Sequence, residues 1–297
     1  AAFVAPKVQF LIVCEMLHLT MEQGMTGAST FALSWYGVLC GDHYNEYGRG
    51  FSSALLAREL IEQHDFTSFK ARTLMPLDQV SIWVMPVSYA IACAKEAFTA
   101  AVANGDRTSA CLALRHQIMN YLTRGDHLDG VLTTIERGLA YVHKARYPDV
   151  ELILQMQRSY VLHLRDLPEG PLTGDNFFQP ALPALAPGSA VEPIFLMQFW
   201  SLLYKGMAHF FAGEYTQARH CFVQAEPLTG SIPGHIHMLD FHLYSALSLT
   251  IPLAAGECLP DAREIVQRHV DRIALWAAGN ARTFADKAAL IEAEMLR

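Results

Sequence analysis

The chain has 297 residues, of which 52% are hydrophobic and 17% are charged, and its formal net charge is −7. This composition is rich enough in apolar side chains for a core and excludes disorder over most of the length. The acidic balance and the lack of any basic run argue against a nucleic-acid surface, which needs clustered Lys and Arg to replace counterions.

The spacing of the apolar residues predicts an all-α chain. Apolar residues recur three and four positions apart through most of the sequence, and alternating runs of β-branched residues are missing. Pro148 and Asp149 suit a helix start, because Pro is tolerated in the first turn and Asp complements the helix dipole. In chain order, the predicted helices span 7–23, 28–40, 45–63, 66–75, 86–104, 107–124, 127–146, 149–165, 192–212, 215–226, 235–255, 260–278 and 281–296.

One stretch interrupts this series of helices. Residues 166–193 are rich in proline, which lacks a backbone donor and blocks the helical turn. We expect a long loop or hinge there, between helical repeats in 1–165 and in 194–297, within one continuous solenoid. The loop is either a connector that packs along neighbouring helices or an interaction loop anchored by Phe177 and Phe178, because loops of this length are often functional.

The cysteines and the uncharged runs bear on compartment and membrane. No two cysteines form a close pair, so we expect reduced, mostly buried thiols in a cytoplasmic protein. The longest uncharged runs are 25–41, 79–94 and 241–256, each shorter than the roughly 20 apolar residues of a membrane span. No basic stretch followed by a long apolar core begins the chain, so we expect no secretory signal. The cysteines are Cys14, Cys40, Cys93, Cys111, Cys221 and Cys258.

A short pattern after one glycine explains how the helices pair. In "GEYTQARHCFVQA", three residues follow Tyr215 at offsets +3, +7 and +10, and they lie on one stripe of a helix. Gly213 is expected to end the preceding helix in the left-handed conformation, and the acid after it to cap the next helix. Small residues on the stripe let the paired helix approach closely. The residues of this pattern are Gly206, Gly213, Tyr215, Ala218, Phe222 and Ala225.

The same offsets recur elsewhere in the chain. A unit of two helices cannot bury its own apolar face, whereas stacked neighbours can, so the unit repeats. The turn glycines are Gly41, Gly105, Gly125, Gly213 and Gly256. Further copies of the stripe are Tyr44, Tyr47, Phe51 and Ala54; Leu128, Val131, Ile135 and Gly138; and Leu259, Ala262, Val266 and His269, with a weaker copy after Gly105.

These residues resemble the tetratricopeptide repeat, whose second half reads Gly-acid-Tyr followed by small, aromatic and Ala positions. The resemblance implies antiparallel helix hairpins in a right-handed superhelix. Three departures mark a degenerate array. His209 stands where an aromatic residue is usual, Pro227 comes early, and other copies carry one inserted residue.

A wider resemblance covers nearly the whole chain. It rests on "SWYGVLCGDHYNEYGRGFSSALLARELIE", "FKARTLMPLDQVSIWVMPV", "ANGDRTSACLALRHQIMNYLTRGDHLDGV" and "DKAALIEAEMLR". These look like the helical-repeat region of large signalling proteins that join a Ser/Thr-kinase-like domain and a STAND-type AAA ATPase to these repeats. A GAF domain and often a histidine kinase follow. The resemblance implies that this chain is an excised segment and that kinase and ATPase activities lie outside it.

Enzyme signatures are missing from the sequence, so we predict no catalytic, cofactor-binding or metal-binding residues. The chain has no GxxxxGK[ST], GxSxG, HExxH, HRD or DFG motif. The histidine-rich stretch His235, His237, Asp240 and His242 begins a predicted helix, and its spacing does not converge on one metal ion.

Three functions remain open from the sequence. The first is a non-enzymatic scaffold that binds a protein or peptide, including other domains of the same polypeptide. The second is a small-molecule sensor with an apolar pocket around 83–94 and the proline-rich loop as its lid. An all-helical enzyme ranks last. Trp35, Trp83, Trp200 and Trp276 are expected in the core, but Trp83, with Phe177 and Phe178, is also a candidate interaction residue.

Overall fold

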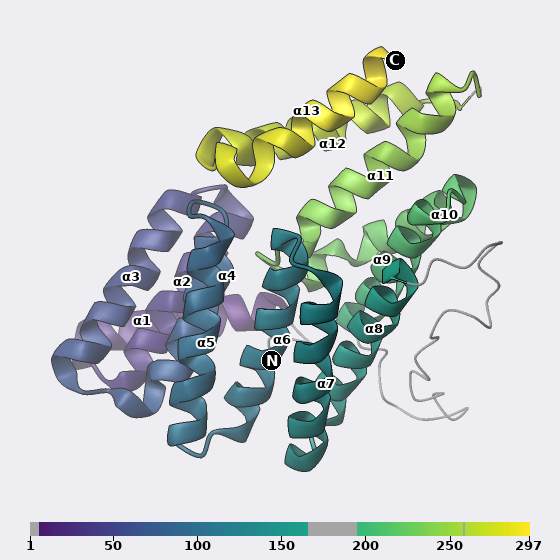
Figure 1. Ribbon diagram of the computed structural model, residues 1–297. Coiled ribbons are helices and arrows are strands. Elements are labelled where there is room, and N and C mark those ends of the chain that lie inside the picture. The colour runs from purple at the N-terminus through teal and green to yellow at the C-terminus, as the bar shows by residue number, and fades with distance from the viewer. Residues whose placement is uncertain (1–5, 166–194, 258) are drawn as a thin grey trace, which may run out of the picture. The chain divides into compact units, whose positions relative to one another are not determined.

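The computed structural model describes residues 6–165, 195–257 and 259–297, and within them the fold is all-α (Figure 1). Thirteen α-helices and two short 3-10 helices make up these residues, and no strand occurs among them. The all-α prediction is therefore confirmed. The helices are α1 (Pro6–Gln23), α2 (Gly27–Tyr44), α3 (Tyr47–His64), η1 (Thr67–Phe69), α4 (Lys70–Ser81), α5 (Val87–Ala103), α6 (Arg107–Arg124), α7 (Leu128–Ala145), α8 (Pro148–Arg165), α9 (Phe195–Phe211), α10 (Tyr215–Ala225), η2 (Glu226–Ser231), α11 (His237–Ala254), α12 (Ala262–Gly279) and α13 (Ala281–Leu296).

The turns follow the predicted chemistry with one correction. Gly105, Gly125, Gly213 and Gly256 have φ values between +69° and +89°, which ordinary residues resist. Gly41 does not have a positive φ, and the turn predicted there is wrong. It lies inside α2 against the ring of Tyr47, and the helix ends instead at Asn45, with a φ of +57°.

Caps agree with the prediction only in part. The Asp106 carboxylate accepts a hydrogen bond from the Ser109 amide, as an N-cap acid should. Glu214 makes no such bond; its Oε2 lies 2.6 Å from Nδ1 of His209. The histidine that replaces the usual aromatic residue of the repeat thus pairs with the acid of the turn.

Four of the cysteines are buried free thiols, and they are Cys40, Cys93, Cys111 and Cys221. Of the helices that the structure describes, none combines the length and the hydropathy that crossing a membrane requires.

The chain divides into two compact units. The N-terminal unit comprises Ala1–Glu151 together with Pro233–Ile236. The C-terminal unit comprises Leu152–Ile232 and His237–Arg297. The predicted division into 1–165, a proline-rich loop and 194–297 stays a prediction. Phe177 and Phe178, in that loop, lie outside the described residues.

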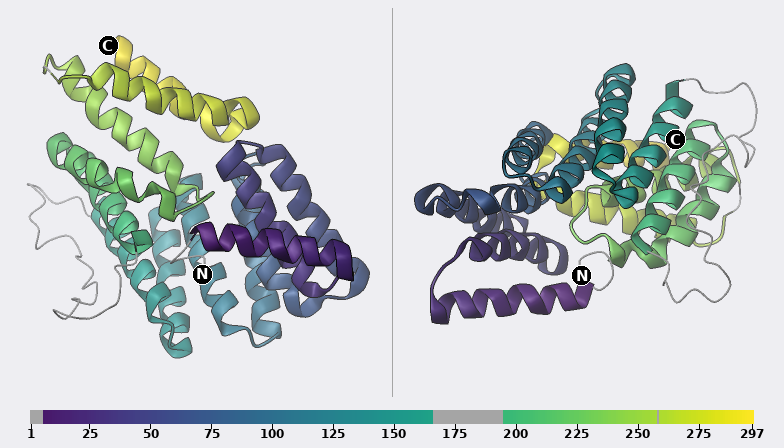
Figure 2. Two further views of the ribbon diagram at one scale, coloured as in Figure 1. Left: turned by 180° about the vertical axis from the view of Figure 1, so that it is seen from behind. Right: turned by 90° about the horizontal axis from the view of Figure 1, so that it is seen from below.

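In the N-terminal unit, successive helices pack on their neighbours in the chain, as in a helical-repeat solenoid. Helix α1 lies along α2, and α2 pairs with α3, α4 with α5, and α5 with α6 (Figure 2). Gly37 and Gly50 allow α2 and α3 to touch, since a Cβ on either would collide with the main-chain carbonyl of the other. The core of these hairpins contains Val38, Ala54, Leu74, Leu77, Val80, Cys93, Ala97 and Ala113.

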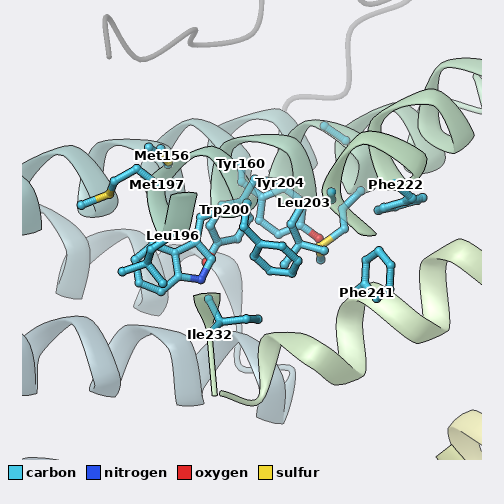
Figure 3. Packing of buried hydrophobic residues seen from close by; sticks show 14 of the residues in the cluster. Met156, Tyr160, Leu196, Met197, Trp200, Leu203, Tyr204, Phe222, Ile232 and Phe241 are labelled. Carbon is cyan, nitrogen blue, oxygen red and sulfur yellow. The ribbon is translucent and has the colours of Figure 1, made fainter. Parts of the chain in front are cut away.

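In the C-terminal unit, α9 pairs with α10, and α12 and α13 lie side by side (Figure 1). Side chains from α8, α9, α10 and α11 meet in one apolar cluster (Figure 3). Gly206 of α9 lets the Phe222 ring of α10 approach, because an added Cβ would lie 2.7 Å from Cε1 of that ring. The cluster includes Tyr160, Leu196, Phe199, Trp200, Leu203, Tyr204, Phe222, Ile232 and Phe241.

Candidate functional site

A site of specific polar contacts lies on the N-terminal unit, where the segment Pro233–Ile236 packs against helices far away in the sequence. This inserted segment is non-helical and stands between η2 and α11 in the chain. It belongs to the N-terminal unit by its contacts, although the residues on both sides of it belong to the other unit.

Three side chains bind consecutive main-chain groups of the inserted segment. Gln79 of α4 donates its Nε2 to the carbonyl oxygen of Pro233 at 2.6 Å. The indole Nε1 of Trp83, just after α4, donates to the carbonyl oxygen of Gly234 at 3.1 Å. Asp42 of α2 accepts the Gly234 amide at 2.8 Å. All three contacts are made to the backbone of the segment and not to its side chains.

Steric fit adds a requirement for glycine at position 234. Its φ is +68°, and a Cβ there would lie 2.7 Å from Cγ1 of Val38. Ile236 is 1% exposed and His235 is 6% exposed, so both side chains that follow are buried. Tyr47 stacks on the Trp83 ring with 5.2 Å between ring centroids, which holds the indole in place.

A buried polar cluster lies next to the inserted segment. Nδ1 of His116 is 2.7 Å from Oδ2 of Asp78, and Nδ2 of Asn120 donates to Oδ1 of the same carboxylate at 2.8 Å. The Arg115 guanidinium contacts Nε2 of His116. His235 of the inserted segment lies beside this cluster, 6.0 Å from His116 between ring centroids.

The electrostatics of the cluster set the tautomer of His116. Burial, helped by the charge of Arg115, lowers the pKa of His116, while Asp78 opposes that shift. The imidazole is therefore neutral. Its Nδ1–H donates to the Asp78 carboxylate, and its Nε2 accepts from the Arg115 guanidinium. The negative Asp78, the neutral His116 and the positive Arg115 thus form a chain of contacts in the interior. In this chain the charges of Asp78 and Arg115 offset each other.

The chemistry of this cluster is structural in kind. Both ring nitrogens of His116 are engaged, so neither is available to abstract a proton or bind a metal. Over the described ranges, no group of three His, Cys, Asp or Glu side chains has the geometry to hold a metal ion. The cluster joins α4 to α6 through Asp78, His116 and Asn120.

Comparisons with known proteins add little to this picture. No protein-family model matches the chain, and no curated protein matches it. One solved structure with a similar chain is the apo form of the quorum sensor NprR from B. thuringiensis, with 15% identity and a TM-score of 0.44. The alignment covers 98% of this chain and 77% of that one. At this level of similarity no functional inference follows, so the function proposed below rests on the residues of this chain.

A pocket in the C-terminal unit lies between α11, α12 and α13. Its volume is about 190 Å³, below the roughly 300–1,000 Å³ that small-molecule sites usually have. It does not involve residues 83–94, where the sequence suggested an apolar pocket. The lining residues are Thr250, Leu253, Ala254, Arg263, Val266, Glu294, Met295 and Arg297.

The sequence-predicted residues are spread over both units. Trp83 is 3% exposed and binds the inserted segment. Tyr44 is 61% exposed at the end of α2, whereas Ala54 and Phe51 pack in the core of the N-terminal unit. Tyr215 begins α10 and contacts Phe210. Ala218, Phe222 and Ala225 are buried in the core of the C-terminal unit.

The histidine-rich stretch does not act as one group. His235 lies beside His116. Nε2 of His237, by contrast, is hydrogen-bonded to the Tyr204 hydroxyl at 3.0 Å. His242 pairs with His269 of α12. Three histidines close in sequence therefore belong to three separate contacts.

Sequence reasoning missed two side chains that bind the inserted segment, Asp42 and Gln79, and the neighbouring buried pair of Asp78 and His116. Asp42 and Gly234 are 192 positions apart, and nothing in the local pattern around either one pairs them. The available signal was modest: polar residues inside an otherwise apolar stretch of α4, and a Pro-Gly pair before a helix.

Proposed function

We propose that this chain is a non-enzymatic helical-repeat interaction segment of a larger signalling protein. The repeated hairpin carries the proposal. At offsets +3, +7 and +10 the stripe is buried in α10 and again in α7, where the residues are Val131, Ile135 and Gly138. Each helix buries one face against its neighbours, and its other face is accessible to a partner. Binding a partner on these faces is the usual role of such arrays.

The wider setting proposed for the chain is a protein with kinase-like, STAND ATPase, GAF and histidine kinase modules. The order of the sequence stretches that resemble the repeat region of such proteins supports this setting. In it, binding on the repeats would shift the ATPase between two states, with a coupling of typically 1–3 kcal/mol, or roughly 5–150-fold in affinity.

The test uses the neighbouring modules of the same gene product. Each is purified and titrated against the immobilised chain, and ATP hydrolysis by the ATPase module is measured with and without the chain. We expect saturable binding to at least one module and a changed hydrolysis rate. A gene product without these modules, or modules that neither bind nor respond, would overturn the proposal; the ATPase module with an unrelated helical protein is the control.

The alternative function, a small-molecule sensor with a pocket around 83–94, has less support. In the structure, the polar edge of Trp83 is engaged by Gly234, and its ring is stacked on Tyr47. These two contacts at Trp83 favour a surface that binds backbone over a cavity that binds a metabolite.

A further inference from the structure

We infer that the N-terminal unit is a receptor for a peptide and that the chain's own Pro233–Ile236 occupies it in cis. The inference rests on the proposed function as an interaction segment and names the ligand class. The ligand is a non-helical peptide with a glycine in the left-handed conformation, followed by an imidazole or similar flat ring and an aliphatic side chain.

The N-terminal unit recognises the main chain of the inserted segment. Asp42, Gln79 and Trp83 stand on or beside two packed helices, and they bind two carbonyl oxygens and one amide of the inserted segment. Contacts of this kind give affinity without regard to the side chains of the bound segment, while small pockets give specificity. The Asp42 contact is charge-assisted, and such hydrogen bonds are stronger than neutral ones.

Selectivity at three consecutive positions is the second argument. Position 234 excludes any side chain, because Val38 occupies the space that a Cβ would need. The next two side chains, His235 and Ile236, are buried in the same unit. A loop that only connects two helices has no need of all three features together with three side-chain contacts to its backbone.

Occupation in cis gives the site its resting state. A covalently attached segment competes at an effective concentration in the millimolar range, so a free peptide binds only when it displaces that segment. Partner segments with the same pattern therefore compete with Pro233–Ile236 for Asp42, Gln79 and Trp83.

The first experiment releases the segment from its own side. Gly234→Ala is compared with Gly230→Ala, whose added Cβ meets no atom within 4 Å. Amide hydrogen exchange of the inserted segment and the anisotropy of a fluorescein-labelled peptide of sequence SIPGHIHML are measured. We expect Gly234→Ala to exchange faster at 233–236 and to bind the peptide at least tenfold more tightly than the wild type or Gly230→Ala does.

The second experiment removes a receptor group. Gln79→Met keeps the size of the side chain but loses the amide that donates to Pro233. Combined with Gly234→Ala, it should leave the segment released and weaken peptide binding at least tenfold. A labelled peptide with alanine at the glycine position should not bind either variant. If Gly234→Ala loses helical circular dichroism, a chain with Gly-Ser-Gly-Ser at 233–236 takes its place as the released form.

Two results would overturn the inference. One is a folded, released form that does not bind the peptide, which would make the segment a fixed structural loop. The other is peptide binding that Gln79→Met leaves unchanged. Both outcomes are separate from the proposed function, because binding to the neighbouring modules is measured with the wild-type chain and without this peptide.

Discussion

At the residue scale, single atoms decide how close two helices come. Gly37 and Gly50 face each other between α2 and α3, and neither position has room for a Cβ. Protein interiors are packed like organic crystals, so an added methyl group has to push the backbone away. Glycines at close helix contacts are therefore sensitive positions of this chain.

Gly50→Ala should lower the free energy of unfolding by about 1–3 kcal/mol, the usual cost of overpacking. Gly48→Ala is the matched control, because it lies in the same helix and its Cβ would meet no atom within 4 Å. That control should be neutral or stabilising by up to about 1 kcal/mol, since alanine favours the helix more than glycine does. Urea denaturation of both variants measures the difference, and equal stabilities would contradict the close approach.

The Asp78 carboxylate is the second residue with a large expected effect. Asp78→Ala removes the acceptor of both His116 and Asn120 and takes the negative charge out of the buried cluster that also holds Arg115. Loss of one partner of a buried pair costs about 3–5 kcal/mol. Asp129→Ala, at a carboxylate with 67% of its side chain exposed, should change stability by less than about 0.5 kcal/mol. Thermal unfolding compares the two, and similar melting temperatures would disprove a structural role for the cluster.

At the element scale, the hairpin is the unit of stability. Helices α9 and α10 pack through the Gly206–Phe222 contact, and α11 and α12 through a histidine pair. Each contact joins two helices that are neighbours in the chain. Substitutions at these contacts therefore act on one hairpin at a time.

Phe222→Ala should destabilise the C-terminal unit by about 3–5 kcal/mol, because it empties a buried aromatic site in the α9–α10 hairpin. The next residue supplies the control. Val223 is 68% exposed, so Val223→Ala should cost less than about 0.5 kcal/mol. Hydrogen exchange of the amides in α9 and α10 gives the measurement. Equal protection in both variants would show that the repeat stripe does not hold the hairpin.

Acid should weaken the packing of α11 on α12. Nδ1 of His242 lies 2.8 Å from Nδ1 of His269, so one ring donates to the other, and the accepting Nδ1 carries no proton. Burial lowers the pKa of His242 to about 3, with His269 and Arg272 adding to the shift. Burial, with Arg268, lowers the pKa of His269 to about 4.

The sign follows from the direction of these shifts. At a pH between the unfolded pKa of about 6.5 and the lowered folded values, the unfolded chain binds more protons than the folded chain. The contribution of the pair to the free energy of unfolding is therefore fully present above about pH 6.5 and falls as the pH drops. Each histidine contributes up to about 1.4 kcal/mol per pH unit. Melting temperatures from pH 7 down to about pH 4.5 should fall more steeply for the wild type than for a His242→Phe, His269→Leu double variant. Parallel curves would count against the pair.

At the scale of the whole molecule, the bounds of single helices can be predicted from sequence further than the contacts between distant helices. Helix α6 was predicted as 107–124 and has these bounds, because its apolar period and the glycines on both sides are local signals. The turn at Gly41 was wrong for a reason of the same kind. A Gly-Asp pair is a turn signal only where the backbone reverses, and here the Tyr47 ring packs on Gly41 inside a continuing helix.

The candidate site was hardly predictable at all. The sequence marks Trp83 as a candidate interaction residue, but nothing in it pairs Asp42 or Gln79 with the stretch at 233–236. The contacts run from side chains to backbone, and backbone groups are the same at every position of the chain. The residue types at 233–236 do not predict which helices supply the donors for their carbonyl oxygens.

The amino-acid sequence by itself determined the local plan of this protein: which stretches are helical, which of their faces are apolar, and that pairs of them repeat. Those properties depend on residues three to ten positions apart, which the backbone period brings together in any helix. Only the tertiary structure decided that Pro233–Ile236 packs on α2 and α4, and that Asp78, His116 and Arg115 share one buried cluster. Such contacts depend on how distant helices meet, and packing rather than local sequence sets that meeting.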